Sequence, residues 1–253
     1  MGMLKKPSRQ YLLFVCFFKK GESKMESDNI LNQKKLVGEK AAEYIEDGMV
    51  VGLGTGSTVY YTITKLAQLV KKGLSIRGIP TSVQTEEMAK KLGIPLATFK
   101  EIDEIDIAID GADEYDPRFN LIKGGGGALL REKIIANAAK KFIVVATPDK
   151  RVEKLGQFPL PVEVVPFGAE ITKKQLLVFG CEPQLRQYQG GSFKTDNGNF
   201  ILDCRFGEIS RPQSLAEKLN RIPGVVEHGL FIDRTDILIT LDQTGSIIVQ
   251  NPK

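Results

Sequence analysis

Histidine and cysteine are scarce in this sequence, and tryptophan is absent. The 253 residues include one histidine, His228, and three cysteines, Cys16, Cys181 and Cys204, none of them in a C-x-x-C pair. Cysteines so few and so far apart favour neither a disulfide framework nor a zinc site, and they suit a reducing compartment. With a single imidazole available, any proton transfer is expected to depend on carboxylates or lysines.

Long apolar runs are also missing. The longest, residues 11–18, spans only eight residues with lysines on both sides. A transmembrane helix needs about 18 apolar residues, and a secretory signal needs a small-residue cleavage pattern, which does not follow here. We therefore expect a cytoplasmic protein without a membrane partner. Residues 1–27 are interpreted as an extension, either disordered or the product of a mis-assigned start, and deleting residues 1–24 is expected to leave activity intact.

An excess of one charge is lacking as well. The 35 basic and 31 acidic residues give a formal charge of +4, with no basic stripe of the kind that follows a nucleic-acid backbone. We expect no nucleic-acid partner. The hydrophobic fraction of 42% is that of a globular chain long enough to bury one large core or two smaller ones.

Helical and strand-like patterns alternate through the first 150 residues. Several strands read as continuous apolar runs, which is typical of strands buried on both faces of a parallel sheet that helices cover on both sides. The sequence therefore predicts an α/β fold. The expected helices are 32–45, 60–70, 86–92 and 129–140, and the expected strands are 49–53, 75–79, 96–99, 105–109 and 142–146.

The pattern changes near the segment Phe158-Pro159-Leu160-Pro161, which is interpreted as a linker. Beyond it the order of elements is mixed, which indicates a small α+β unit. Helices are expected at 170–179 and 214–219, two short strands within 193–205 around the turn 196–198, and two further strands at 237–241 and 246–249 that rejoin the first sheet. The predicted domains are residues 28–155 plus 230–253, and residues 156–229.

Polar residues follow the carboxyl ends of four predicted strands, the edge at which ligands bind in open α/β sheets. Hydroxyls, carboxylates and an ammonium gathered there would suit a polyhydroxylated, phosphorylated ligand. The residues are Gly54-Thr55-Gly56-Ser57-Thr58, Thr81-Ser82, the pair Asp110 and Asp113, and Lys150.

The loop 54–58 opens a helix, where free backbone N–H groups and the helix dipole attract an anion. It lacks the lysine of a P-loop, and Ser57 stands at the third glycine position of the dinucleotide fingerprint, so a nucleotide is not expected. A compact strand-to-helix connection is the alternative interpretation.

Asp110 and Asp113 lie three residues apart directly after an apolar strand, and each alone is equally typical of a turn or a helix cap. Lys123 follows ten residues later and precedes the four glycines 124–127. Such a run costs backbone entropy on ordering and fills no core, so backbone groups packed closely against a ligand would account for it. A flexible linker is the alternative, although linkers seldom separate a lysine from a strong helix.

Glu132 is the candidate base. Leu129, Ile135 and Ala136 share its side of the predicted helix, so its carboxylate is expected to face apolar surroundings. Partial burial would raise its pKa above the ordinary value of about 4.3 and make it a better base near neutral pH. A capping or structural role is the alternative. His228 is expected in the second domain, away from these loops.

Seven segments, in this order, resemble the type A ribose-5-phosphate isomerases. The resemblance extends from about Asn32 to the C-terminus, and its departures are the N-terminal extension and Gly127, where some members carry alanine. The segments are Gly-Thr-Gly-Ser-Thr at 54–58, Asp-Gly-Ala-Asp at 110–113, Lys-Gly-Gly-Gly at 123–126, Leu-Arg-Glu-Lys-Ile at 130–134, Phe-Pro-Leu-Pro-Val-Glu-Val at 158–164, Thr-Asp-Asn-Gly-Asn at 195–199 and Ile-Pro-Gly-Val-Val at 222–226.

The resemblance implies a Rossmann-like domain beside a smaller α+β domain, a homodimer or homotetramer, and no metal or organic cofactor. It implies interconversion of ribose 5-phosphate and ribulose 5-phosphate in the non-oxidative pentose phosphate pathway, with Glu132 carrying a proton between C1 and C2 through an enediolate. Asp110, Asp113 and Lys123 would complete the catalytic group. The implied substrate-binding residues are Thr55, Gly56, Ser57, Thr58, Asp110, Gly111, Ala112, Asp113, Lys123, Gly124, Gly125, Gly126 and Lys150.

Two other functions occur on similar folds. A coenzyme A transferase would use a glutamate as nucleophile and would need a thioester-binding region. A sugar-phosphate sensor of a transcription regulator would normally bring a DNA-binding helix-turn-helix, for which the residues before Asn32 are too few and too irregular. Formation of ketose from ribose 5-phosphate in deuterated water would separate the isomerase from both.

Overall fold

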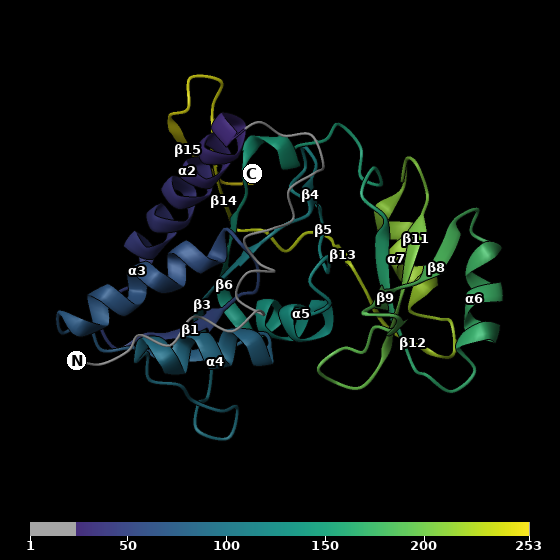
Figure 1. The fold of residues 1–253 in the computed structure, drawn as a ribbon, viewed down its shortest axis with the longest axis horizontal. Helices are drawn as coiled ribbons and strands as arrows, with labels where there is room; N and C mark the ends of the chain where they lie inside the picture. Colours follow the sequence, from purple (N-terminus) through teal and green to yellow (C-terminus); the bar gives the residue numbers. More distant parts are fainter. Residues whose placement is uncertain (1–23, 253) are drawn as a thin grey trace.

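The computed structural model describes residues 24–252, and its main feature is a six-stranded sheet in the order β15-β14-β6-β3-β1-β2 (Figure 1). All neighbouring strands are parallel except β15, which runs antiparallel to β14. The predicted α/β fold with a mostly parallel sheet is therefore confirmed. The bounds are β1 (Val50–Leu53), β2 (Arg77–Pro80), β3 (Ile105–Gly111), β6 (Ala139–Val145), β14 (Ile237–Leu241) and β15 (Ile247–Gln250). The predictions made for residues 1–23 lie outside the described residues.

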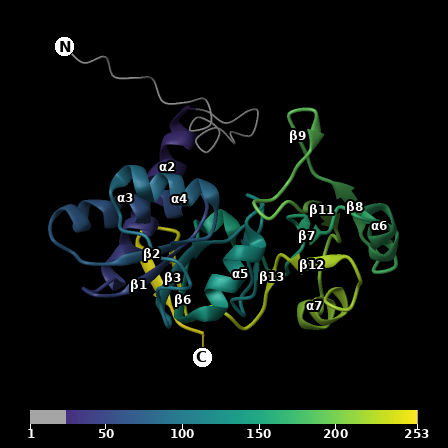
Figure 2. The same cartoon turned by 90° about the horizontal axis from the view of Figure 1, so that it is seen from below.

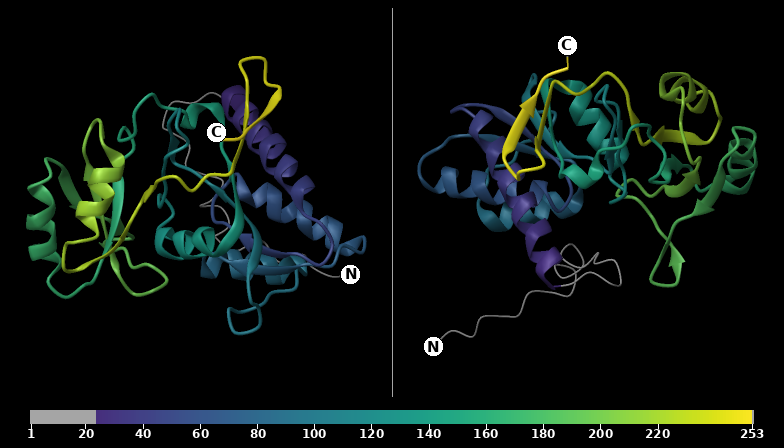
Figure 3. Two further views of the ribbon diagram at one scale, coloured as in Figure 1. Left: turned by 180° about the vertical axis from the view of Figure 1, so that it is seen from behind. Right: turned by 90° about the horizontal axis from the view of Figure 1, so that it is seen from above.

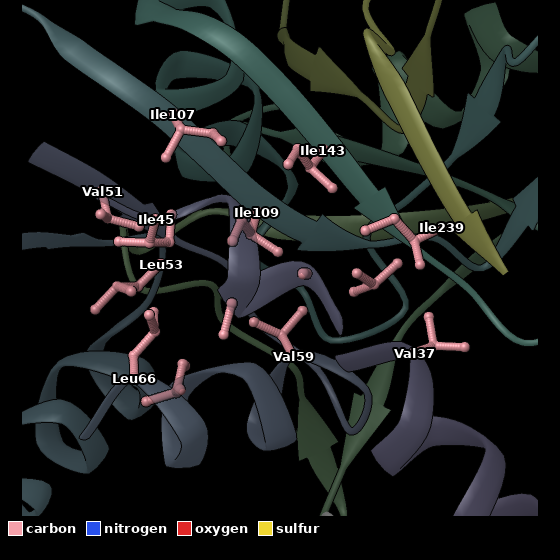
Figure 4. Packing of buried hydrophobic residues seen from close by; sticks show 14 of the residues in the cluster. Val37, Ile45, Val51, Leu53, Val59, Leu66, Ile107, Ile109, Ile143 and Ile239 are labelled. Carbon is pink, nitrogen blue, oxygen red and sulfur yellow. The ribbon is translucent and has the colours of Figure 1, made fainter. Parts of the chain in front are cut away.

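Helices cover both faces of this sheet, as the apolar runs predicted. Helices α2 (Lys24–Ala41), α3 (Val59–Lys71) and α4 (Val83–Leu92) contribute to one core, in which Val37 and Leu66 pack with strand residues such as Ile109 (Figure 4). Helix α5 (Leu129–Ala138) covers the other face, where Ile135 packs with Phe142. No helix within residues 24–252 is long and apolar enough to cross a membrane.

A second group of elements, which we call the second unit (residues 160–228), builds its own antiparallel sheet in the order β12-β7-β11-β8. It lies to the right in Figure 1, and the hairpin of β9 and β10 projects from it in Figure 2. Leu160, Val162 and Leu202 belong to its separate core. The elements are β7 (Leu160–Val164), α6 (Ala169–Leu177), β8 (Glu182–Leu185), β9 (Gln187–Tyr188), β10 (Gly191–Ser192), β11 (Phe200–Arg205), α7 (Pro212–Leu219) and β12 (Val225–His228). The exact domain boundaries stay a prediction.

The chain returns from the second unit to complete the first sheet. Strand β13 (Leu230–Phe231) joins a small antiparallel sheet with β5 (Leu121–Ile122) and β4 (Glu114–Tyr115), and β14 then pairs with β6. Figure 3 shows this yellow C-terminal segment crossing back to the main sheet. The prediction that the tail rejoins the first sheet is confirmed.

The interpretation of residues 158–161 as a linker is wrong for its second half. Leu160 and Pro161 begin β7, a central strand of the second unit. The residues before them are fixed as well, because the buried Glu114 carboxylate accepts hydrogen bonds from the backbone N–H groups of Gly156, at 2.7 Å, and Phe158. Pro161 has no N–H to donate, but its carbonyl accepts a hydrogen bond from the Gly229 N–H at 2.8 Å.

Several element boundaries also differ from the prediction. Helix α5 ends at Ala138 and β6 begins at Ala139, without a glycine or proline to mark the change, because Ala139 already pairs with Ile105 of β3. The strand predicted at 96–99 is reduced to one bridge between Leu96 and Gly78. The first helix begins earlier and ends earlier than predicted, and a short 3-10 helix, η1 (Ala42–Tyr44), follows it. Of the two strands expected around the turn 196–198, only β11 is adjacent to it.

Candidate active site

The candidate site lies where the strand order of the main sheet reverses. β1 pairs with β2 on one side and with β3 on the other, which is the point at which open α/β sheets bind ligands. The loops leaving β1 and β3 meet there, because the Thr55 N–H donates to Asp110 Oδ1 at 3.1 Å. A Cβ on Gly54 would lie 2.3 Å from the same oxygen, so this contact requires glycine.

Three charged side chains meet in the protein interior at this point. Lys123 Nζ lies 3.1 Å from Asp110 Oδ2 and 3.2 Å from Glu132 Oε2, and it donates a hydrogen bond to the Gly111 carbonyl at 2.6 Å. The side chains of all three are at most 4% exposed. One ammonium thus lies between two buried carboxylates that the sequence places 22 positions apart.

Burial and mutual repulsion raise the proton affinity of these carboxylates. Burial is the main cause that raises the pKa of Glu132 to about 8; repulsion from Asp110 acts in the same direction and Lys123 opposes it. Burial likewise raises the pKa of Asp110 against the attraction of Lys123. Burial alone would lower the pKa of Lys123, but Asp110 and Glu132 outweigh it and raise that pKa, so the ammonium stays charged. The cluster therefore carries a proton that can be exchanged near neutral pH.

Two buried oxygens of the cluster lack a hydrogen-bond donor in the described part of the chain. Within the described residues, Asp110 Oδ2 and Glu132 Oε2 accept no hydrogen bond of good geometry and are held by charge alone. Buried acceptors are normally satisfied, and unsatisfied ones mark places where a ligand can complete the set. A hydroxyl-bearing molecule would supply the missing donors.

The glycine run has structural reasons within the protein itself. The Gly125 N–H donates to Asp113 Oδ2 at 2.7 Å, and a Cβ on Gly125 would lie 2.6 Å from Asp113 Oδ1. Gly124 and Gly127 adopt φ values of +105° and +81°, which side chains rarely adopt. The close approach inferred from the sequence is thus partly an approach to neighbouring side chains. Asp113 is half-buried, and burial raises its pKa.

Hydroxyl groups line the neighbouring loop. Thr55 Oγ1 lies 2.7 Å from Thr81 Oγ1, 2.8 Å from Ser82 Oγ and 3.2 Å from Thr85 Oγ1. Ser82 also caps α4 by accepting the Thr85 N–H. The structure thus joins the two strand ends that the sequence marked with hydroxyls. Residues 55–58 are partly exposed and lead into α3, and the start of a helix is a position where an anion is favoured.

The remaining predicted residues lie around this centre. Lys150 ends the short 3-10 helix η2 (Pro148–Lys150), lies 3.6 Å from Asp149 Oδ2 and adds positive potential at Asp113. Gly111 supplies the carbonyl that holds Lys123, and the half-buried Ala112 packs against the core. His228 is nearer to the site than expected, since its Nδ1 lies 3.5 Å from the Lys133 ammonium, next along the chain to Glu132. Burial lowers the pKa of His228 to about 3, which keeps it neutral.

Sequence reasoning missed two side chains near the site. Arg186 of the second unit donates to the Gly124 and Gly125 carbonyls at 3.0 and 3.1 Å and pairs with Asp203, so it clamps the glycine run from outside. The Phe231 ring lies 5.4 Å from Lys123 Nζ. Neither residue stands in a pattern that marks it, because both reach the site only through the tertiary fold.

Comparisons with known proteins identify the family and its fold. The family model described as ribose 5-phosphate isomerase A (phosphoriboisomerase A) matches residues 77–245. The chain is 53% identical over 219 residues to the ribose-5-phosphate isomerase A of Listeria innocua, covering 86% of this chain and 98% of that one. It resembles a solved ribose 5-phosphate isomerase from Plasmodium falciparum with a TM-score of 0.85 and 39% identity, covering 88% and 99% of the two chains. A D-ribose-5-phosphate isomerase solved in complex with phospho-erythronic acid matches with a TM-score of 0.84 and 42% identity, covering 87% and 98%.

Proposed function

The chain belongs to the ribose 5-phosphate isomerase A family, and on this premise we propose which of its residues perform the isomerisation. The enzyme interconverts ribose 5-phosphate and ribulose 5-phosphate, a reaction of the pentose phosphate pathway. The coenzyme A transferase and sensor interpretations are therefore set aside. Glu132 is the base, and the observation that carries this assignment is the Lys123 ammonium between the buried Asp110 and Glu132 carboxylates.

The isomerisation moves two hydrogens. Glu132 takes the proton from C2 of the open-chain aldose and returns it to C1 of the enediolate, while O1 gains a proton and O2 loses one. A carbon acid beside a carbonyl needs a positioned base and a positive group near the developing oxyanion. Glu132 supplies the first, and Lys123, fixed by Gly111 and Asp110, supplies the second. The raised pKa of Glu132 suits a base that works near neutral pH.

The two aspartates differ in exposure and therefore in their proposed parts. Asp110 is buried, and its Oδ1 already accepts from Thr55 and Gly111, so it mainly orients Lys123 and offers Oδ2 to the substrate. Asp113 is more exposed and suits a sugar hydroxyl. The phosphate lies at the start of α3. The further proposed substrate contacts are Thr55, Gly56, Ser57, Thr58, Gly111, Ala112, Gly124, Gly125, Gly126 and Lys150.

The direct test is to incubate the protein with ribose 5-phosphate in deuterated water. Solvent deuterium should appear in the ketose, because the proton on a carboxylate exchanges with solvent before some of it is returned. The Glu132→Gln variant should form ketose and exchange the C2 hydrogen at least about a hundredfold more slowly than wild type. Turnover of this variant near the wild-type rate would show that another group is the base.

The relative bound to phospho-erythronic acid suggests a ligand for the same site. This four-carbon acid presents a planar carboxylate where the enediolate presents its two oxygens, with a phosphate at the other end. We propose that it competes with ribose 5-phosphate here and that Lys123→Met weakens its binding more than it weakens binding of inorganic phosphate.

We further propose a cytoplasmic enzyme that acts without metal or organic cofactor and assembles as a homodimer or homotetramer. Activity that survives treatment with a chelator, without added metal, tests the lack of a metal cofactor. The mass measured by light scattering tests the oligomeric state.

A further inference from the structure

One turn of the second unit contacts the first turns of two helices that carry site residues. Asp196 Oδ2 accepts the N–H of Val83, the first residue of α4, at 2.7 Å. Arg131 of α5 donates through NH2 to the Asp196 carbonyl and through Nε to Asn197 Oδ1, both at 3.0 Å. The turn, residues 195–199, thus contacts the starts of two helices. Arg131 lies 65 positions and Val83 113 positions before Asp196 in the sequence.

This turn is held by a buried carboxylate of its own unit. Glu163, in the middle of β7, is fully buried, and its Oε1 accepts from Thr195 Oγ1 and Asn199 Nδ2, both at 2.9 Å. Backbone hydrogen bonds close the turn, and Gly198 takes the left-handed conformation with φ +82°. A turn fixed in this way is rigid enough to position what it touches.

The contacts of the turn lie one residue away from groups of the active site. Val83 follows Ser82, whose hydroxyl is 2.8 Å from Thr55 Oγ1, and Arg131 precedes Glu132. On the other side of Glu132, the Lys133 ammonium donates to Glu227 Oε1 at 2.7 Å and to the His228 carbonyl at 2.6 Å. The second unit therefore holds α5 on both sides of the base.

We propose that the turn 195–199 positions Glu132 relative to the Thr55 loop, with Asp196 and Arg131 as positioning residues that do not touch the substrate. This inference rests on the proposed function of Glu132. A shift of about 1 Å between base and substrate reduces turnover by up to about a hundredfold. Glu132 lies on α5, and the Thr55 hydroxyl contacts Ser82 at the start of α4. An element that fixes the N-termini of α4 and α5 would therefore prevent such a shift.

The test compares kcat, KM and amide hydrogen exchange in four variants of the full chain. Asp196→Ala removes the acceptor of the Val83 N–H, and Arg131→Met removes both hydrogen bonds from α5 to the turn. Each should lower kcat about tenfold or more, with a smaller effect on KM. Asp196→Asn keeps an oxygen for the Val83 N–H and should stay within about threefold of wild type. Glu208→Gln, the matched control, breaks the exposed 2.8 Å ion pair with Lys154 on the second unit and should change nothing.

Two readouts separate positioning from a general loss of stability. Amide exchange should increase at the first turns of α4 and α5 in Asp196→Ala. The apparent pKa in the kcat/KM profile of this variant should differ from that of wild type, because the surroundings of Glu132 change. The double variant Asp196→Ala/Arg131→Met should be no slower than the slower single variant, because both act through one turn. If Asp196→Ala fails to fold, Asn197→Ala takes its place in the test. Asn197 is exposed, and this substitution removes one acceptor of Arg131.

The proposal is overturned if the folded variants keep kcat within about twofold of wild type, or if activity falls only in proportion to the folded fraction. Failure of the proposed function would look different. In that case Glu132→Gln would keep turnover near the wild-type rate, while the exchange at α4 and α5 would still respond to Asp196→Ala.

Discussion

Glu132 is the residue whose surroundings differ most from those of an ordinary carboxylate. Its pKa is raised to about 8 chiefly by burial, and a base is active only when it is deprotonated. We therefore expect kcat/KM for ribose 5-phosphate to rise about tenfold per pH unit below pH 8 and to level off above it. A rate profile measured from pH 5 to 10 checks this, and a plateau already reached at pH 5 would contradict the assignment.

Removing the carboxylate should remove the chemistry and leave the fold. Glu132→Gln keeps the shape of the side chain, so we expect kcat to fall by about 10²–10⁴ while KM changes little. The matched control is Glu86→Gln, which replaces an exposed glutamate on α4 that pairs with Lys90. Steady-state kinetics of both variants decide the matter, and equal rates would refute the role of Glu132.

In the proposed mechanism, Lys123 stabilises the developing oxyanion and also lowers the pKa of Glu132. In Lys123→Met, no cation remains between Asp110 and Glu132, so kcat should fall by about 10²–10³ through loss of oxyanion stabilisation. The pKa of Glu132 should rise further, since Lys123 is the group that lowers it. The rate profile of the variant should move to higher pH, and an unshifted profile would mean that Lys123 and Glu132 are not coupled.

The sequence marked the separate members of the site but not their contacts. Asp110, Lys123 and Glu132 stand in local patterns, namely a strand end, a glycine run and the apolar side of a helix. That one ammonium lies between two carboxylates follows only from the tertiary fold. The contacts of Arg186 and the turn 195–199 with the site could not be predicted, because their partners near the site are more than 60 positions away.

At the scale of elements, the buried strands could be predicted from their apolar runs, but the ends of several elements could not. Strands β1 and β14 are buried along their whole length, and both were found as continuous apolar runs. The change from α5 to β6 at Ala138 and Ala139 was missed, since alanine fits both elements and sheet pairing decides between them. The segment 158–161 was misinterpreted because its prolines mimic a linker while the buried Glu114 holds its start.

The glycine run 124–127 gives a prediction at this scale. Gly125→Ala would place a Cβ 2.6 Å from Asp113 Oδ1 and force the loop away from that carboxylate. We expect kcat/KM to fall about tenfold or more, because a displaced loop misplaces both Asp113 and Lys123. Gly191→Ala is the control, since its Cβ would meet nothing closer than 4.0 Å. Kinetics and thermal melting of both variants test this. Equal effects of the two substitutions would show that the close approach of Gly125 to Asp113 is not needed for activity.

At the scale of the whole molecule, the chain path makes the two parts interdependent. The second unit lies between β6 and β14 in the sequence, so the main sheet is completed only after the chain has passed through that unit. Helix α5 carries the proposed base Glu132 and β3 carries Asp110, and the second unit contacts neighbouring residues through Arg186 and the turn 195–199. If the proposed positioning holds, activity depends on these contacts between the two units.

The raised pKa of Glu132 also affects the free energy of unfolding of the whole protein. A carboxylate with a folded-state pKa of about 8 and an ordinary value of 4.5 stabilises the fold most below pH 4.5, and this contribution is lost as the pH rises to about 8. The loss amounts to about 5 kcal/mol at most. His228 affects the pH dependence of stability in the opposite sense, because its pKa is lowered to about 3. Its contribution is the same in wild type and in a Glu132 variant, so it cancels when the two are compared.

Glu132→Gln removes this loss, since the amide cannot ionise. We therefore expect the inactive variant to be more stable than wild type above pH 8 and the difference to shrink towards pH 5. Denaturant unfolding of both proteins at pH 5, 7 and 9 measures the trend. A difference that is constant with pH, or largest at pH 5, would mean that Glu132 is not held in the fold at the cost of stability.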